Sequence, residues 1–213
     1  NIYVVGSPGC ENLDKIKYLN KKKLEKTLDL KFLAKNIVVT VHPQANRETT
    51  SKLIENLLEA LNTLEDILVI FTGVNPDLNS DLISLKIANY KTKNKFKIFN
   101  HLGKNLYLSL IKQVDCILGN SSSGFIEAPY LKVPVINIGK RQDGRPVSTN
   151  IINTDSKKRN ILKAIKKIYS INFKKNLRFT KSFYFKKNCS LNIIKTLEKK
   201  NLENIKQKKF KNE

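Results

Sequence analysis

The sequence predicts an α/β fold, a Rossmann-like parallel sheet with helices on both faces. Two observations support this prediction. Short apolar segments alternate along the chain with longer segments in which apolar residues recur at helical spacing. The predicted strands are apolar almost throughout, which is typical of parallel strands buried on both faces. At 213 residues the chain is long enough for one large domain or two small ones.

The predicted strands are short runs rich in Val, Ile and Phe, bounded by turn-forming residues. In chain order they are residues 2–5, 36–42, 66–72, 96–99, 114–118, 133–139 and 150–152. The first is ended by a turn at 6–9 that contains two glycines and a proline. The second ends on His42, which Pro43 follows.

The predicted helices lie between these strands and carry their apolar residues on one face. They are residues 22–30, 47–64, 78–90, 105–113, 156–169 and 191–206, with about two further turns after residue 124. Asp155 or Ser156 is the expected cap of the helix at 156–169. Residues 172–187 are basic and are expected to be irregular. We therefore expect one nucleotide-binding domain over residues 1–200 and a polar, frayed tail at 201–213.

The chain is strongly basic, with 40 Lys and Arg against 18 Asp and Glu and a formal net charge of +22. Such a charge suggests a nucleic-acid partner. Very few of the basic residues are arginine, however, although the planar guanidinium is the group best suited to phosphate and base recognition. Lysine is accompanied by many asparagines, a pattern that a genome rich in Lys and Asn codons would also produce.

The cysteines, Cys10, Cys116 and Cys189, are widely spaced and follow no metal-binding or disulfide pattern. No apolar run approaches the length of a membrane span, and no signal peptide is evident. We expect a cytoplasmic protein that uses neither a metal nor a cofactor.

Residues 119–129, Gly-Asn-Ser-Ser-Ser-Gly-Phe-Ile-Glu-Ala-Pro, form the clearest candidate binding loop and lie between two predicted strands. Backbone N–H groups at a helix start are unpaired and carry partial positive charge. With the hydroxyls of Ser121 and Ser122, they suit an anion such as phosphate. Glu127, one helical turn further on, suits the paired hydroxyls of a ribose. An ordinary serine cap on a strand–helix turn is the structural alternative.

Polar residues also follow the other predicted strands, whose carboxyl ends meet at the edge of a parallel sheet where ligands bind. They are His42, Asn75, Asp77, Asn100 to Leu102, and Arg141 to Arg145. Arg141 and His42 suit a diphosphate, and backbone groups at Leu102 suit the edge of a base. A plain loop role for His101 and an ion pair between Arg141 and Asp143 stay open as alternatives. The sequence contains neither a dinucleotide-binding glycine motif nor a P-loop.

Several segments carry a family resemblance. They are 4–9 (Val-Val-Gly-Ser-Pro-Gly), 39–43 (Val-Thr-Val-His-Pro), 71–77 (Phe-Thr-Gly-Val-Asn-Pro-Asp), 119–129 and 139–145 (Gly-Lys-Arg-Gln-Asp-Gly-Arg). These segments resemble the C-terminal domain of UDP-N-acetylglucosamine 2-epimerases, and the resemblance covers roughly residues 2–200. The serine motif and the Arg-Gln-x-Gly-Arg loop are closer to the hydrolysing subgroup, which is associated with sialic-acid-type sugar synthesis.

The resemblance implies a GT-B architecture, in which two Rossmann-like domains hold a nucleotide sugar between them and this chain is the second. It implies diphosphate contacts for Ser121, Ser122, Arg141 and His42, a ribose contact for Glu127, a uracil contact for the backbone at Leu102, and a site-lining place for Asn75. His42 is also the candidate catalytic residue, at the leaving-group oxygen. The loop around Asn75 departs from the usual proline-before-asparagine order of the family.

The family eliminates UDP across C1–C2 to give a glycal and then adds water, which yields N-acetylmannosamine. Its proton-transfer carboxylates lie in an N-terminal domain that is absent from this sequence. The sequence contains no methionine and starts at Asn1, which we interpret as the back part of a longer polypeptide. We therefore expect the chain alone to bind UDP weakly and to lack turnover.

Two other functions stay open from the sequence. One is the nucleotide-binding half of a GT-B glycosyltransferase, because a fold does not fix a function. The other, more distant, is a basic nucleic-acid-binding module. The expected partners are a UDP-sugar and the N-terminal domain, without nucleic acid or membrane. The sequence decides neither the exact sugar nor the oligomeric state, and a homo-oligomer is compatible with it.

Overall fold

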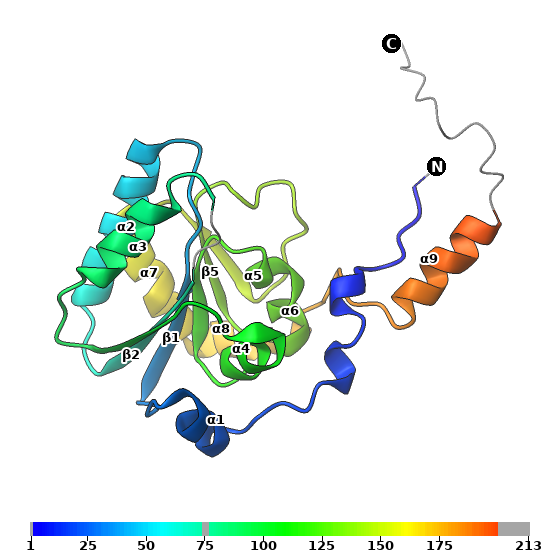
Figure 1. The fold of residues 1–213 in the computed structure, drawn as a ribbon, viewed down its shortest axis with the longest axis horizontal. Coiled ribbons are helices and arrows are strands. Elements are labelled where there is room, and N and C mark those ends of the chain that lie inside the picture. Colours follow the sequence, from blue (N-terminus) through cyan, green and yellow to red (C-terminus); the bar gives the residue numbers. More distant parts are fainter. Residues whose placement is uncertain (1, 74–76, 200–213) are drawn as a thin grey trace, which may run out of the picture.

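The computed structural model describes residues 2–73 and 77–199 (Figure 1). Within them, six parallel strands form one sheet in the order β3-β2-β1-β4-β5-β6. The strands are β1 (Lys35–Thr40), β2 (Ile67–Thr72), β3 (Lys95–Phe99), β4 (Cys116–Gly119), β5 (Val135–Ile138) and β6 (Ile151–Thr154). The chain runs outward from β1 to β3 and then returns to place β4 beside β1. This reversal of direction marks the place where sheets of this kind bind ligands.

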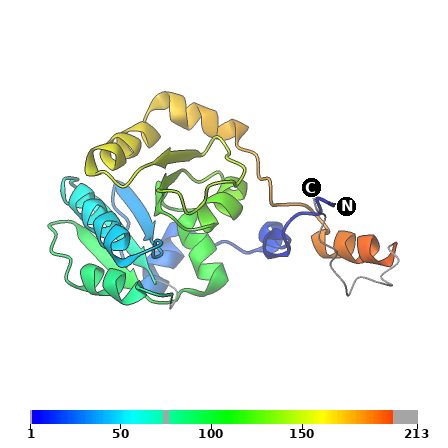
Figure 2. The same ribbon diagram turned by 90° about the horizontal axis from the view of Figure 1, so that it is seen from above.

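Helices cover both faces of the sheet, as the sequence predicts (Figure 2). The described helices are α1 (Lys21–Leu28), α2 (Arg47–Asn62), α3 (Ser80–Ala88), α4 (Gly103–Ile111), α5 (Ser123–Ile126), α6 (Ala128–Leu131), α7 (Lys158–Ile168), α8 (Ile171–Asn176) and α9 (Cys189–Glu198). Short 3-10 turns lie at Pro8–Cys10, Leu13–Lys15 and Leu177–Phe179. The predicted α/β fold with a parallel sheet is confirmed.

The sheet separates two apolar cores, and β1 contributes to both. Ile37 and Val39 pack in the core that α2, α3, α7 and α8 cover. Val38 points to the opposite face, where α1, α4, α5 and α6 pack. Val38 also lies between Ile70 of β2 and Ile117 of β4 in the register of the sheet. Because successive strand residues face opposite sides and both sides are covered, the strand has to be apolar throughout.

The structure contradicts three local predictions. Residues 2–5 form no strand: Ile2 and Val4 are 95% and 72% exposed, since no edge of the sheet lies beside them to pair with their backbone. The region 172–187 is not wholly irregular, because it includes most of α8. Neither predicted residue caps α7, which Lys157 precedes; Asp155 Oδ1 instead accepts the Lys157 backbone N–H at 2.9 Å.

The first residues and the last described helix lie side by side, away from the sheet (Figures 1 and 2). Glu11 accepts hydrogen bonds from both the backbone N–H and the hydroxyl of Ser190, at the start of α9. The Ser7 backbone N–H donates to the Tyr184 carbonyl at 2.8 Å. The two ends of the described chain are thus joined directly. The predicted tail at 201–213 lies outside the described residues.

Candidate nucleotide site

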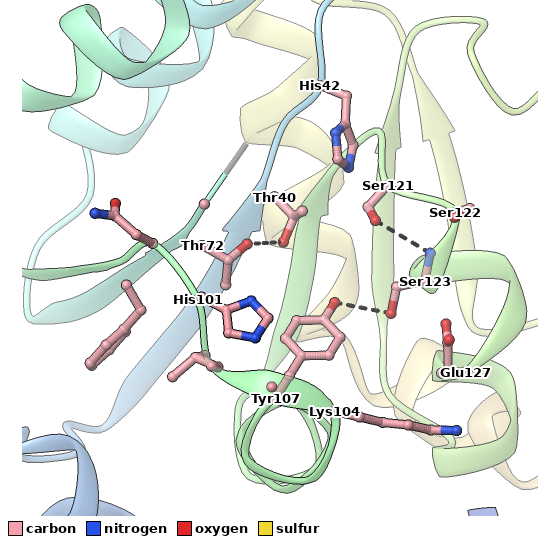
Figure 3. Close-up of a pocket in the computed structure, with 15 residues that line it drawn as sticks. Thr40, His42, Thr72, His101, Lys104, Tyr107, Ser121, Ser122, Ser123 and Glu127 are labelled. Atoms are coloured by element: carbon pink, nitrogen blue, oxygen red, sulfur yellow. Dashed lines mark hydrogen bonds between the residues drawn. The ribbon is translucent and has the colours of Figure 1, made fainter. Parts of the chain in front are cut away.

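A cavity of about 560 Å³ opens at the carboxyl ends of β1, β2, β3 and β4 (Figure 3). Its lining includes five of the site residues that the sequence predicts: His42, Leu102, Ser121, Ser122 and Glu127. His101 also lines it. The loops that follow β1, β2, β3 and β4 therefore converge here, as the sequence predicts, whereas no described lining residue comes from the predicted fifth loop at 141–145.

Two glycines allow the backbone segments around the cavity to approach one another. Gly119 has a φ of +145°, and a Cβ atom there would lie 2.0 Å from the Thr40 carbonyl oxygen. A Cβ atom at Gly73 would lie equally close to the Asn100 carbonyl oxygen, at 2.0 Å. Neither position can hold a side chain without moving the backbone, so glycine brings β4 against β1 and the end of β2 against the loop after β3.

The serine loop is only weakly used for capping. Ser122 precedes α5 and makes no capping hydrogen bond from its side chain within the described structure. Ser121 Oγ accepts the Ser123 backbone N–H, but the distance is 3.3 Å. Ser121 and Ser122 both line the cavity, where their polar groups can meet an anionic ligand.

His42 lies at the upper end of the cavity as drawn in Figure 3, and its side chain is largely buried. Burial lowers the pKa of His42 below its usual 6.5, nearby Arg141 lowers it further, and Asp77 opposes the shift. The imidazole is therefore neutral at pH 7. Its Nδ1 atom is buried and has no hydrogen-bond partner among the described residues.

Glu127 lies at the opposite end of the cavity (Figure 3), and burial raises the pKa of its carboxyl group. Its Oε2 atom is buried and without a partner in the described part of the chain. A hydrogen bond from Ser123 counteracts part of the pKa shift. Ser123 Oγ in turn accepts a hydrogen bond of 2.9 Å from the Tyr107 hydroxyl. A half-buried carboxylate with a free oxygen is suited to receive two ligand hydroxyls.

Arg141 does not line this cavity. Its side chain is exposed, and its Nη1 atom donates to the Asn120 carbonyl oxygen at 3.3 Å. The alternative ion pair with Asp143 does not occur among the described residues. Arg141 is linked to His42 through Asn120, which bonds to both residues, and the charge of Arg141 contributes to the lowered pKa of His42. Asn75 lies outside the described residues.

The sequence missed several residues that the structure places in or behind the cavity. Thr40 and Thr72 share a hydrogen bond of 2.6 Å between their hydroxyls on its floor. Tyr107 enters from α4, more than ten residues away from the serine loop in sequence. The sequence does contain one indication of Thr40. It lies two residues before His42, and side chains two residues apart along an extended chain point to the same side.

Some chemistry is not provided by the described lining. Glu127 is the one carboxylate among the described residues that line the cavity. No cluster of three or more His, Cys, Asp or Glu residues that could hold a metal occurs in residues 2–73 and 77–199. Within the same ranges, no helix has the length and hydropathy that crossing a bilayer requires.

Several known proteins are similar to this chain. The family model described as UDP-N-acetylglucosamine 2-epimerase matches residues 1–198. A Campylobacter jejuni protein named GDP/UDP-N,N'-diacetylbacillosamine 2-epimerase (hydrolyzing) is 41% identical over 213 residues, covering 98% of this chain and 55% of that protein. The Escherichia coli polysialic acid biosynthesis protein P7 is 32% identical over 203 residues, covering 93% of this chain and 51% of that protein.

Among solved structures, UDP-GlcNAc 2-epimerase from Neisseria meningitidis bound to UDP-GlcNAc has a TM-score of 0.70 at 19% identity. The match covers 89% of this chain and 52% of that one. The structural match shows the fold, which is that of the C-terminal half of a GT-B enzyme. The chain spans about half the length of the curated relatives it matches. The sequence match and the fold together place this chain in the UDP-N-acetylglucosamine 2-epimerase family.

Proposed function

We propose that this chain is the UDP-binding half of a hydrolysing UDP-N-acetylglucosamine 2-epimerase, acting on UDP-GlcNAc or a UDP-linked diacetamido sugar. The observation that carries the proposal is the layout of one cavity. His42 and the hydroxyls of Ser121 and Ser122 lie at one end, and the half-buried Glu127 lies at the other. This order of groups matches the diphosphate and the ribose of a nucleotide.

Each residue then has a defined role. Ser121, Ser122 and Arg141 bind the diphosphate oxygens, and Arg141 supplies the positive charge. Glu127 accepts hydrogen bonds from the ribose hydroxyls through its free oxygen. Backbone groups at Leu102 contact the base. Asn75, outside the described residues, stays a prediction for the lining of the same site.

In the proposed reaction, a base removes the proton at C2 of the sugar and the C1–O bond breaks. The electron pair of that bond leaves with UDP, and a C1=C2 glycal forms. Water then adds across the double bond to give N-acetylmannosamine or a related amino sugar. This chain stabilises the leaving group: neutral His42 donates a hydrogen bond to its oxygen, and Arg141 offsets its charge.

The base that acts at C2 is not among the described lining residues, since Glu127 is occupied by the ribose in this arrangement. We therefore predict that the 213-residue chain binds UDP and does not turn over UDP-GlcNAc. Calorimetric titration with UDP, and chromatography of UDP-GlcNAc incubated with the chain, measure the two parts separately. A chain that fails to bind UDP contradicts the proposed UDP site. Release of UDP from UDP-GlcNAc at enzyme-like rates contradicts the proposal that this chain lacks the base that acts at C2.

The nucleotide-binding half of a GT-B glycosyltransferase has the same fold, but the family match and the hydrolysing relatives favour the epimerase. We also propose a role in sialic-acid-type sugar synthesis, which the similarity to the polysialic acid biosynthesis protein supports. A cytoplasmic location fits the three cysteines, which are buried and unpaired.

A further inference from the structure

Asn120, the residue before the serines, is fully buried and lies behind the cavity and not in its lining. Its side-chain amide makes two hydrogen bonds to the backbone of one residue, His42. Oδ1 accepts the His42 N–H at 2.7 Å, and Nδ2 donates to the His42 carbonyl at 2.9 Å. Asn120 therefore satisfies both backbone polar groups of a residue in the proposed site.

These two side-chain hydrogen bonds extend the pairing between β1 and β4 by one further step. The pairing of β1 with β4 ends at Thr40 opposite Gly119, and the Asn120 backbone N–H still donates to the Thr40 carbonyl at 3.2 Å. Beyond that point, the Asn120 amide pairs with His42 as a peptide group of a neighbouring strand would. Without it, the buried N–H and C=O of His42 would have no such partner, which is costly.

The carbonyl oxygen of Asn120 links a third loop. It accepts hydrogen bonds from Arg141 Nη1 at 3.3 Å and from the buried Gln142 Nε2 at 2.9 Å. The loops that follow β1, β4 and β5 are thus joined at one residue. All four proposed diphosphate contacts come from these loops. Asn120 bonds to two of them, His42 and Arg141, and directly precedes Ser121.

We propose that Asn120 is a positioning residue for the diphosphate and does not itself touch the ligand. Its side-chain amide holds His42 in place, and its backbone carbonyl oxygen holds Arg141 in place. This inference rests on the proposed UDP site. A purely architectural role is the competing explanation, and Asn150 provides a matched control for it. Asn150 is equally buried, and its Nδ2 donates to the Val133 carbonyl at 2.7 Å, at the amino end of β5.

The first test compares UDP with uridine, which lacks the diphosphate, by NMR titration of the 213-residue chain. Asn120→Ala is expected to weaken UDP binding by about tenfold and to change uridine binding by less than about twofold. Asn150→Ala is expected to keep both affinities within about twofold of those of the parent chain, even if it lowers the melting temperature as much as Asn120→Ala does. An equal loss of UDP and uridine affinity in Asn120→Ala would overturn the proposal. Asn120→Ser serves the same purpose if the alanine variant does not fold.

The second test is a double-mutant cycle with His42→Ala. In the parent chain this substitution is expected to weaken UDP binding, and in the Asn120→Ala background it is expected to have little further effect. Additive effects would show that Asn120 does not act through His42. If the parent chain binds no UDP, the proposed function fails. The His42 amide resonance then still decides the positioning: an unchanged shift in Asn120→Ala contradicts it, and a shift typical of a lost hydrogen bond supports it.

Discussion

At the scale of single residues, the site is built from groups whose ordinary hydrogen bonding is incomplete. Buried Oε2 of Glu127 and Nδ1 of His42 have no partner in the described structure, although buried polar atoms are nearly always paired. These two atoms lie at opposite ends of one cavity, which is consistent with the proposed ligand contacts (Figure 3).

Glu127 allows a test that separates stability from binding. Burial raises the pKa of its carboxyl group, so the folded chain holds this proton more tightly than the unfolded chain. The protonated carboxyl group of Glu127 therefore contributes its full stabilisation of the fold below the pKa of the unfolded chain, near 4.5. This contribution is lost as the pH rises through the higher pKa of the folded chain. We predict that Glu127→Gln raises the melting temperature by about 2–4 °C at pH 7 and not at pH 4.

The same variant is expected to bind UDP more weakly, because a neutral amide oxygen accepts weaker hydrogen bonds than a carboxylate and its NH2 group cannot accept any. The parent chain should prefer UDP to 2'-deoxy-UDP, and Glu127→Gln should lose that preference. A variant that is stabilised at pH 7 but keeps the preference would remove Glu127 from the ribose site while leaving the pKa argument intact.

At the scale of elements, the site depends on how closely β4 approaches β1. Gly119 and Gly144, two of the glycines with positive φ, can be compared. A Cβ atom at Gly119 would lie 2.0 Å from the Thr40 carbonyl oxygen, while one at Gly144, with φ +84°, would meet nothing within 4 Å. We predict that Gly119→Ala lowers the free energy of unfolding by about 3 kcal/mol or more, and Gly144→Ala by about 1–2 kcal/mol.

Urea unfolding followed by circular dichroism measures both variants. The difference between them reports the steric contact at Gly119 together with any difference in backbone strain between φ +145° and φ +84°. Equal losses would mean that β4 can move away from β1 without penalty.

The elements also show how far sequence patterns reach. Each apolar run from residue 36 to residue 154 was predicted as a strand, and each forms one within a few residues. The run at 2–5 is also apolar but lies beside α9 and not beside a strand. Composition fixes the tendency to form a strand, whereas pairing needs a neighbour that only the folded chain provides.

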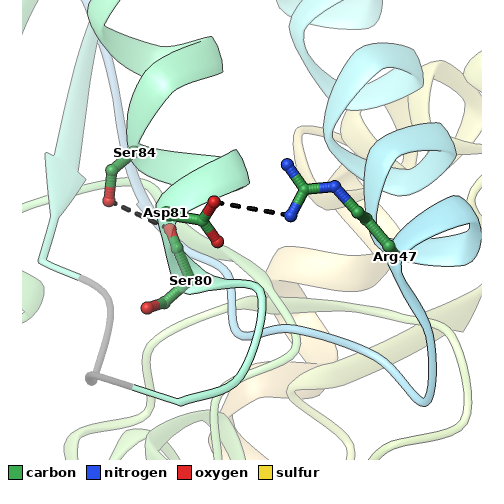
Figure 4. A network of polar contacts seen from close by, with 4 residues as sticks. All are labelled: Arg47, Ser80, Asp81 and Ser84. Carbon is green, nitrogen blue, oxygen red and sulfur yellow. Dashed lines mark hydrogen bonds and ion pairs between the residues drawn. The ribbon is translucent and has the colours of Figure 1, made fainter.

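At the scale of the whole molecule, the chain carries a net charge of +22, so most of its basic residues have no acidic partner. Four ion pairs occur among the described residues, and most of the side chains in them are well exposed. Arg47 of α2 and Asp81 of α3 are an example, at 3.4 Å with both side chains about 60% exposed (Figure 4). Exposed pairs of this kind contribute little to stability.

Self-repulsion of the excess positive charge should therefore be screened by salt. We predict that the melting temperature rises between low salt and about 0.3 M NaCl, while the affinity for UDP falls because its attraction is screened as well. Differential scanning fluorimetry and calorimetry follow the two quantities. Sodium sulfate at equal ionic strength is the control, since a much larger effect of sulfate would indicate anion binding and not screening.

The sequence by itself determined the fold class, the family resemblance and most of the candidate site, because buried parallel strands and their terminal loops leave continuous local patterns. His42, Leu102, Ser121, Ser122 and Glu127 all lie in short motifs and line one cavity. Only the tertiary structure decided which strands are neighbours, that Arg141 lies beside the cavity and not in its lining, and that Asn120, Thr72 and Tyr107 support it. The physical reason is that these contacts join residues far apart in the chain. A hydrogen bond between β1 and β4, or from α4 to the serine loop, exists only after the chain has reversed direction and brought both partners together.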